Sequence, residues 1–285
     1  MKNYTLWIKK FLKDKNGVLG LTILTILVII AIFGTSIAPY SSHYVNPKNR
    51  LQPPSLEHFM GTDHMGRDLF SRILLGTRLS LSIAITAITA SLIVGCLWGL
   101  VAGYYEGWLG IILMRIADMF VALPRIVMAL VISAALGPGI ENTIWALSIT
   151  YWPFWTRVVY ADVVHIKKSP FIEATASLGA SKARVIFLHM LPNIAPGIII
   201  RTTISLGGTI IESALLSFVG LGAQPPTPDW GLDLATSRNY LPTAWWFAFF
   251  PGLMILITAM AFNLFGDSLR DIIDPTLRIS GQSGD

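Results

Sequence analysis

Long apolar stretches, separated by polar ones, set the pattern of this chain. A membrane-spanning helix needs about 20 mostly apolar residues. Three stretches of spanning length carry no charge, and three further apolar stretches contain charged residues. The pattern predicts an all-α polytopic membrane protein with six transmembrane helices. These lie at 18–38, 79–105 and 245–265 (uncharged) and at 121–136, 143–164 and 194–221 (charged).

The polar segments complete the predicted organisation. If both termini are cytoplasmic, 14 Lys and Arg residues lie in inside segments and 6 in outside segments, which is the bias typical of cytoplasmic loops. The predicted order is a cytoplasmic amphipathic segment (1–17), the first transmembrane helix (18–38), an extracytoplasmic loop (39–78), a five-helix core with a cytoplasmic hairpin at 165–192 (79–266), and a cytoplasmic tail (267–285).

Composition narrows the class further. Only 13% of the residues are charged, against about 25% in soluble domains. The single cysteine, Cys96, excludes a disulfide framework. The net charge of +5 is spread over loops, so nucleic acid is not an expected partner. The basic start lacks a small-residue cleavage site before spanning length is reached, so an uncleaved first helix is expected.

The first 17 residues repeat apolar side chains every three or four positions, with lysines between them. This pattern predicts a helix lying on the anionic cytoplasmic leaflet and contacting membrane lipid. A disordered basic tail is the alternative. The apolar positions are Tyr4, Trp7, Ile8, Phe11 and Leu12.

The pattern of segment 165–192 predicts two short amphipathic helices joined at Gly179, which is expected to adopt a left-handed conformation. The Ser169 hydroxyl is expected to cap the first helix, with Pro170 at the first helical position, and Ser181 can cap the second helix. One apolar face comprises Phe171, Ala174, Thr175 and Leu178, and the other comprises Ala183, Ile186, Phe187 and Met190. Leu191-Pro192 is expected to end the hairpin. Such an element can seat in a groove on a soluble partner, or it can pack only against its own membrane helices.

Charged residues inside the predicted spans are costly in lipid and usually face protein or water. Glu212, Arg201, Arg157 and Asp162 are therefore candidates for the translocation pathway or for contacts between helices, with Glu212 the deepest. Arg157 and Asp162 can instead snorkel to the cytoplasmic surface. Arg115 and Asp118, three residues apart, can pair with each other. Pro153 is expected to kink its helix. The histidines lack the spacing of metal ligands, so no metal site is expected.

The loop 39–78 contains the motif Gly61, Thr62, Asp63, His64, Met65, Gly66, Arg67, Asp68. Arg67 and Asp68 can cap a helix that starts near Asp68 and runs into the second span. A contact for a binding protein or an outer gate is one interpretation. A structural ion pair is the interpretation we favour.

The hairpin resembles the cytoplasmic signature of ABC importer permeases, which reads Glu-Ala-Ala, three residues, Gly, nine residues, Ile, any residue, Leu-Pro. Thr175 replaces the second alanine here and His189 replaces the isoleucine. The residues expected to couple to an ATPase are Glu173, Ala174, Thr175, Gly179, Ala180, Ser181, Leu191 and Pro192.

Other segments resemble the peptide and nickel branch of that family, most closely its second permease subunit. They are 61–68 with Ser71-Arg72, 217–222 with Pro225-Pro226 and Asp229-Trp230-Gly231, and 266–271 with Asp274-Pro275. The likeness runs from about residue 8 to about residue 278.

This resemblance implies the type I ABC importer permease fold in a prokaryotic cytoplasmic membrane. It implies a pore subunit, not an enzyme, that works with a second permease, two ATPases and an extracytoplasmic substrate-binding protein. The chain has no G-x-x-x-x-G-K-[ST] loop, so ATP and Mg²⁺ are expected on the ATPases and no cofactor on this chain. The expected cargo is a di- or oligopeptide. The alternatives are nickel or a metal chelate and, less favoured, an ion-coupled secondary transporter, although no internal repeat supports the last.

Overall fold

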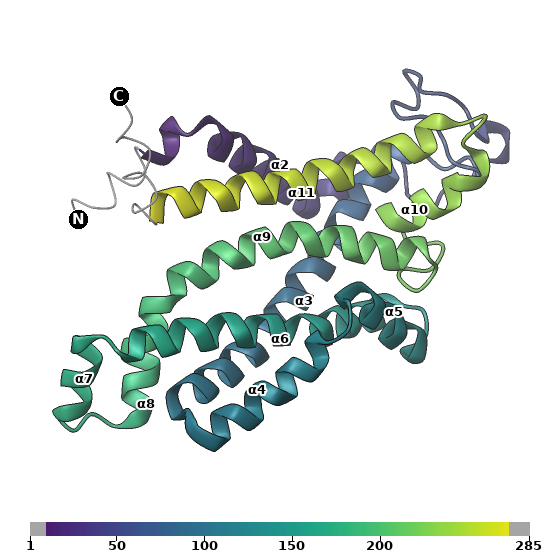
Figure 1. The fold of residues 1–285 in the computed structure, drawn as a ribbon. Helices are drawn as coiled ribbons and strands as arrows, with labels where there is room; N and C mark the ends of the chain where they lie inside the picture. The colour runs from purple at the N-terminus through teal and green to yellow at the C-terminus, as the bar shows by residue number, and fades with distance from the viewer. Residues whose placement is uncertain (1–9, 274–285) are drawn as a thin grey trace, which may run out of the picture.

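The computed structural model describes residues 10–273 and contains no named β-strand in that range (Figure 1). The α-helices are α2 (Lys15–Ile37), α3 (Leu69–Tyr105), α4 (Gly107–Val121), α5 (Arg125–Leu136), α6 (Ile140–Lys167), α7 (Pro170–Ser177), α8 (Lys182–Arg184), α9 (Leu191–Phe218), α10 (Trp230–Ser237) and α11 (Trp245–Ile273). Short turns of other helical types are η1 (Pro47–Asn49), η2 (Val185–Met190) and η3 (Arg238–Tyr240).

Four helices of the described range are long and apolar enough to cross a membrane, which makes this a multi-pass membrane protein. They are α2, α3, α11 and a continuous helix from Lys182 to Phe218. The pair α4 and α5 adds a fifth pass if it is counted as one bent span. The predicted fourth span lies within α6, which has 28 residues. Six passes remain a prediction.

The predicted third span, 121–136, is wrong in its placement. The chain bends by 82° between α4 and α5, and the break falls inside this segment. Pro124 explains the break, because proline lacks a backbone N–H and disfavours helical geometry in the residue before it. The preceding α4 is a 15-residue helix, while the 12-residue α5 is too short to span a membrane.

Other predicted boundaries also shift. The loop predicted at 39–78 is irregular only as far as Asp68, since α3 begins at Leu69. The tail predicted from 267 begins as helix, because α11 continues to Ile273. The predicted amphipathic helix lies largely outside the described residues, although 10–13 are helical.

The helices form a layered bundle with two distinct ends (Figure 1). The start of α2, the end of α11 and the hairpin α7–α8 lie at one end, which we call the hairpin end. Helices α5 and α10 and the loop before α3 lie at the other, which we call the loop end. Helix α3 packs against α6 through three glycines at four-residue spacing, where a Cβ on Gly95 would lie 2.5 Å from the Trp152 carbonyl oxygen. Such small residues let membrane helices approach closely.

Candidate functional site: the hairpin and the charged face

Helix α7 opens the hairpin with Pro170 at its first position, as predicted. The predicted capping role of the Ser169 hydroxyl is wrong. This hydroxyl donates back to the Ile166 carbonyl at 2.5 Å, and the Ser169 carbonyl accepts from the amide of Ile172 at 3.0 Å. The preceding helix ends so close to Pro170 that the hydroxyl satisfies a carbonyl of α6 instead.

The turn of the hairpin has the predicted geometry. Gly179 has φ +82°, a left-handed conformation that costs other residues free energy. A Cβ at Gly179 would meet no atom within 4 Å, so the backbone conformation alone favours glycine. After the turn and Ala180, the Ser181 side chain accepts from the amide of Arg184 at 3.3 Å and caps α8, as predicted.

The hairpin is anchored on one side and exposed on the other. Ile172 is 3% exposed and packs in a core cluster with Val185 and Met190, which also contains residues of α3, α6 and α9. In contrast, Leu178 is 88% exposed and Phe171 is 44% exposed. The predicted face of α7 is therefore not the face that packs on this chain, and its Phe171 and Leu178 side chains are exposed.

The second predicted face divides between core and surface. Ile186 and Met190 are buried, whereas Ala183 and Phe187 are exposed. Glu173 and Ala174 of the signature are exposed, and Thr175 donates its hydroxyl to the Phe171 carbonyl at 2.7 Å. Glu173 also borders a hollow of about 300 Å³ that is lined by Lys167 and Lys168.

The second hairpin helix does not stop at Leu191-Pro192, contrary to the prediction. Helix α8 continues through the π-helical turn η2 into α9 as one element from Lys182 to Phe218. Pro192 is tolerated because it lies in the first turn of α9, after a stretch whose hydrogen bonds already differ from α-helical ones.

The four candidate pathway residues all form ion pairs between helices. Arg201 of α9 donates to Asp162 of α6 at 2.8 Å. Arg157 of α6 donates to Asp118 of α4 at 2.6 Å, so the predicted Arg115–Asp118 pair is wrong. Glu212 of α9 pairs with Arg125 at the start of α5. Arg157 and Asp162 therefore engage neighbouring helices instead of only snorkelling.

Two levels of contact lie at equal spacing along α6 and α9. At one level Asp162 faces Arg201, and at the other Tyr151 and Glu212 both contact Arg125. On each helix the two positions are eleven residues apart, which is close to three full turns and about 16 Å of axial rise. Arg125 joins the second level, with its guanidinium 4.0 Å from the centre of the Tyr151 ring.

These charged side chains remain partly exposed in the single chain. The exposed fractions are 43% for Arg201, 48% for Arg157 and 39% for Arg125. Lipid cannot solvate such groups cheaply. The side of the bundle formed by α4, α5, α6 and α9 therefore faces water or another protein chain.

The loop-end motif forms a buried polar cluster. Asp63 is fully buried and accepts from Arg67 Nε at 2.5 Å and from the amide of Met65 at 2.8 Å. Asp68 caps α3 by accepting from the amide of Ser71 at 2.8 Å, so the predicted helix start is confirmed. The structural ion pair joins Arg67 to Asp63, while Asp68 pairs with His58 at 2.9 Å. Close packing leaves no room for a side chain at two glycines of the motif. A Cβ at Gly61 would meet Trp246, and one at Gly66 would meet the Asn46 carbonyl.

Sequence reasoning missed the residue that joins this cluster to the distant motif 217–231. Arg72 is 1% exposed and donates to Asp233 of α10 at 2.6 Å, and also to the carbonyls of Pro226 and Thr227 at 3.2 Å. Trp230 donates its indole N–H to the Ile73 carbonyl at 3.1 Å. The sequence signal that could have identified Arg72 was the presence of an arginine within the otherwise apolar start of a helix. Nearby, burial raises the pKa of Asp229 to about 6.

Comparisons with known proteins agree with this architecture. Residues 95–279 match the model of the binding-protein-dependent transport system inner membrane component, and residues 5–54 match the N-terminal transmembrane domain of oligopeptide transport permease C. An inward-facing structure of the MetNI methionine ABC transporter aligns with a TM-score of 0.60 at 18% identity, covering 70% of this chain and 95% of that chain.

Three relatives cover almost all of the chain. The dipeptide transport system permease protein DppC of Alkalihalophilus pseudofirmus is 42% identical over 95% of this chain and 89% of its own length. The di/tripeptide transport system permease protein DppC of Pseudomonas aeruginosa is 38% identical over 95% of this chain and 91% of its own length. The glutathione transport system permease protein GsiD of Escherichia coli is 41% identical over 95% of this chain and 89% of its own length. The chain belongs to the family of binding-protein-dependent transport permeases, as a DppC/OppC-like subunit of an ABC importer.

Proposed function

We propose that this chain forms half of the translocation pathway for small peptides, together with a second permease subunit. Two ATPase subunits would bind at the hairpin end, and an extracytoplasmic binding protein would deliver cargo at the loop end. The peptide cargo rests on the relatives, which are named for dipeptide, di/tripeptide and glutathione transport. These names give no support to the nickel alternative, and the family membership gives none to the ion-coupled alternative.

The observation that carries this proposal is the two-sided hairpin. Its inner side, with Ile172 and Val185, is buried against the membrane helices. Its outer side presents Phe171 and Leu178. A partner seated on the outer side would move the hairpin and the membrane helices as one packed unit, which is the physical requirement for rigid-body coupling.

The charged face supports the pathway. A zwitterionic peptide carries one positive and one negative end, and each ion pair on α4, α5, α6 and α9 offers both complementary charges. Cargo can exchange partners with such a pair without leaving a charge unpaired in a medium of low dielectric constant. Gly197 and Gly208, each four residues before a charged residue of α9, limit side-chain bulk beside the two levels.

The direct test of coupling compares two exposed leucines at opposite ends. Leu178→Glu should leave folding unchanged and should abolish copurification of the ATPase subunits and peptide uptake, because it places a charge in the partner contact. Leu56→Glu, at a residue 93% exposed in the loop before α3, is the matched control for ATPase copurification. Normal ATPase binding by Leu178→Glu would remove the hairpin from the proposed mechanism.

The orientation has its own test. With the hairpin cytoplasmic and the loop before α3 outside, an impermeant thiol reagent applied to intact cells should label Ser55→Cys and spare Ser181→Cys, in a Cys96→Ala background. Labelling of Ser181→Cys from outside would reverse the orientation.

A further inference from the structure

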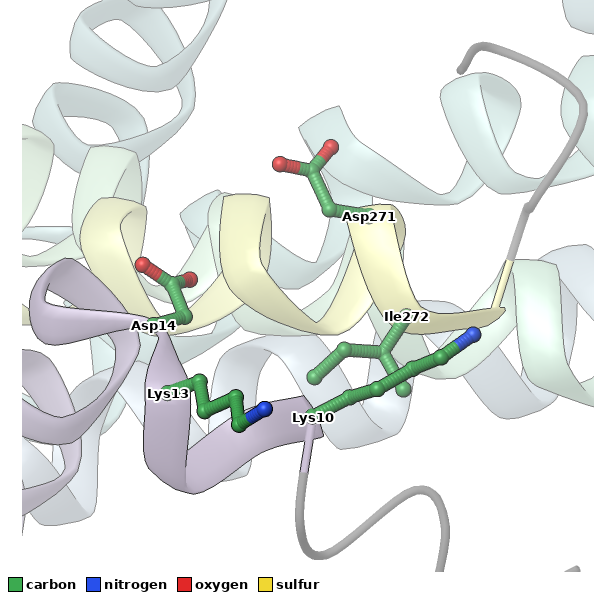
Figure 2. A pocket seen from close by; sticks show the side chains of 5 residues that line it. All are labelled: Lys10, Lys13, Asp14, Asp271 and Ile272. Carbon is green, nitrogen blue, oxygen red and sulfur yellow. The ribbon is translucent and has the colours of Figure 1, made fainter. Parts of the chain in front are cut away.

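Helices α2 and α11 run side by side along a seam (Figure 1). Two hollows border this pair of helices, and α3 and α9 also line the second of them. The first, of about 250 Å³, lies at the hairpin end and is lined by Lys10, Lys13, Asp14, Asp271 and Ile272 (Figure 2). The second, of about 380 Å³, is bordered by Leu21, Val28, Ile85, Leu206, Phe262 and Phe265, among other residues. The first hollow is charged, and the second is apolar.

The two hollows border the same face of α11. Phe265 of the apolar hollow precedes Ile272 of the charged hollow by seven residues on this helix. Seven residues bring a helix back to nearly the same face. They also correspond to about 10 Å of axial rise. The apolar hollow therefore lies about two turns of α11 farther from the hairpin end than the charged hollow.

The charged hollow balances two positive and two negative side chains. In Figure 2, the Lys10 and Lys13 side chains lie lower in the view than the Asp14 and Asp271 carboxylates, and all four residues line the hollow. Among residues 10–273, neither lysine forms an ion pair. A group that carries both a phosphate and an ammonium would satisfy both sides at once.

The apolar hollow lacks free polar groups. Among the residues that line it, only Thr25 has a hydroxyl group. This hydroxyl donates to the Leu21 carbonyl at 2.7 Å, so its hydrogen bond is made within α2. Helices α2 and α11 are in backbone contact beside the hollow, because a Cβ on Gly20 would lie 2.8 Å from the Phe265 amide nitrogen. Within a membrane, an apolar hollow of this kind accepts a hydrocarbon chain.

We propose that this seam is a binding site for one phospholipid with an ethanolamine headgroup. Lys10 and Lys13 bind the phosphate, Asp14 and Asp271 bind the primary ammonium, and an acyl chain occupies the apolar hollow. The seam joins the two segments that match separate family models, 5–54 and 95–279, so a bound lipid bridges the first helix to the core. This site does not depend on the proposed cargo or partners.

The experiment is native mass spectrometry of the detergent-purified full chain, titrated with phosphatidylethanolamine, phosphatidylglycerol or phosphatidylcholine of the same acyl composition. The expected result is one tightly bound phosphatidylethanolamine, retained at least tenfold better than the other two lipids. The Lys10→Ala/Lys13→Ala variant should lose at least tenfold in affinity. The Lys168→Ala/Lys182→Ala variant, with the same charge change elsewhere at the hairpin end, should bind normally.

A second variant tests the apolar hollow independently. Thr25→Trp should fill the hollow and expel the acyl chain, with the thermal unfolding of the lipid-free chain unchanged. Equal retention of the three lipids, or normal binding by the lysine or the Thr25 variant, would overturn the proposal. So would loss of the bound lipid in the assembled transporter isolated through a tag on this chain, because the hollow would then belong to the second permease subunit.

Discussion

Asp162 and Arg201 lie opposite each other on antiparallel helices, with 2.8 Å between Oδ2 and Nη1. Eleven residues farther along each helix, in opposite sequence directions, Tyr151 and Glu212 both contact Arg125 of α5. The two levels therefore fix the register of α6 against α9, and they place charge on the same side of both helices.

The Asp162–Arg201 pair should be more sensitive to loss of one partner than to exchange of both. We expect Asp162→Ala and Arg201→Ala each to lower peptide uptake by roughly tenfold, the equivalent of about 1.4 kcal/mol, because one charge stays unpaired in the membrane. The exchanged double variant Asp162→Arg/Arg201→Asp should recover most of the uptake. A double variant as impaired as the sum of the single changes would contradict the pairing.

Gly179 should tolerate only residues that adopt left-handed geometry. Gly179→Val is expected to strain the turn by about 1–2 kcal/mol and to reduce ATPase copurification and uptake, while Gly179→Asn should be mild. Gly107→Val is the control, because Gly107 also has positive φ and no atom within 4 Å of a Cβ, but lies outside the hairpin. Equal losses in Gly179→Val and Gly107→Val would mean that the strain acts on the whole fold.

Arg72 and Asp233 should behave as a buried, coupled pair. Arg72→Met leaves the Asp233 carboxylate buried without its partner, and loss of one member of such a pair costs about 3–5 kcal/mol. The double variant Arg72→Met/Asp233→Leu should regain part of the free energy of unfolding. Thermal unfolding in detergent measures these two variants and the single variant Asp233→Leu, and strictly additive losses would refute the coupling.

Asp229 should make stability depend on pH in an identifiable window. Burial raises its folded-state pKa to about 6 from an ordinary value of 3.8. The folded state therefore holds the proton more tightly, and stability falls as the pH rises from about 4 to about 6. The Asp229→Asn variant keeps an acceptor for the Leu232 amide. The difference in free energy of unfolding between the unmodified chain and this variant should change by roughly 2–3 kcal/mol across this window.

The exposed Asp267 provides the control for that measurement. Asp267→Asn removes the same charge without removing a buried carboxyl, so its pH profile should follow that of the unmodified chain. If the difference in free energy of unfolding between the unmodified chain and Asp229→Asn stays constant from pH 4 to pH 6, the raised pKa of Asp229 is contradicted.

Local signals in the sequence predicted local structure well. The left-handed Gly179, the cap at Ser181 and the start of α3 after Asp68 each depend on residues within a few positions. The apolar pattern also located α2 and α11 to within a few residues at most ends. Pro124 indicated the break between α4 and α5, but the pattern of apolar residues, on which the span was placed, does not predict a bend.

Partners distant in sequence could not be predicted. Asp118 had a nearby candidate, Arg115, but pairs with Arg157, because the packing of α4 on α6 brings that guanidinium closer. Arg72 and Asp233 are 161 positions apart. The face of α7 was assigned by periodicity, yet Ile172 packs inward since the docking of the hairpin on α6 and η2 decides which side is covered.

The continuity of the helix from Lys182 to Phe218 has a mechanical consequence. An element of 37 residues is about 55 Å long, and it carries the hairpin at one end and Glu212 near the other. A tilt of about 10° around Met190 would displace Phe218, 28 residues away, by about 7 Å, given a rise of about 1.5 Å per residue. A small movement imposed at the hairpin is therefore amplified before it reaches the ion pair with Arg125.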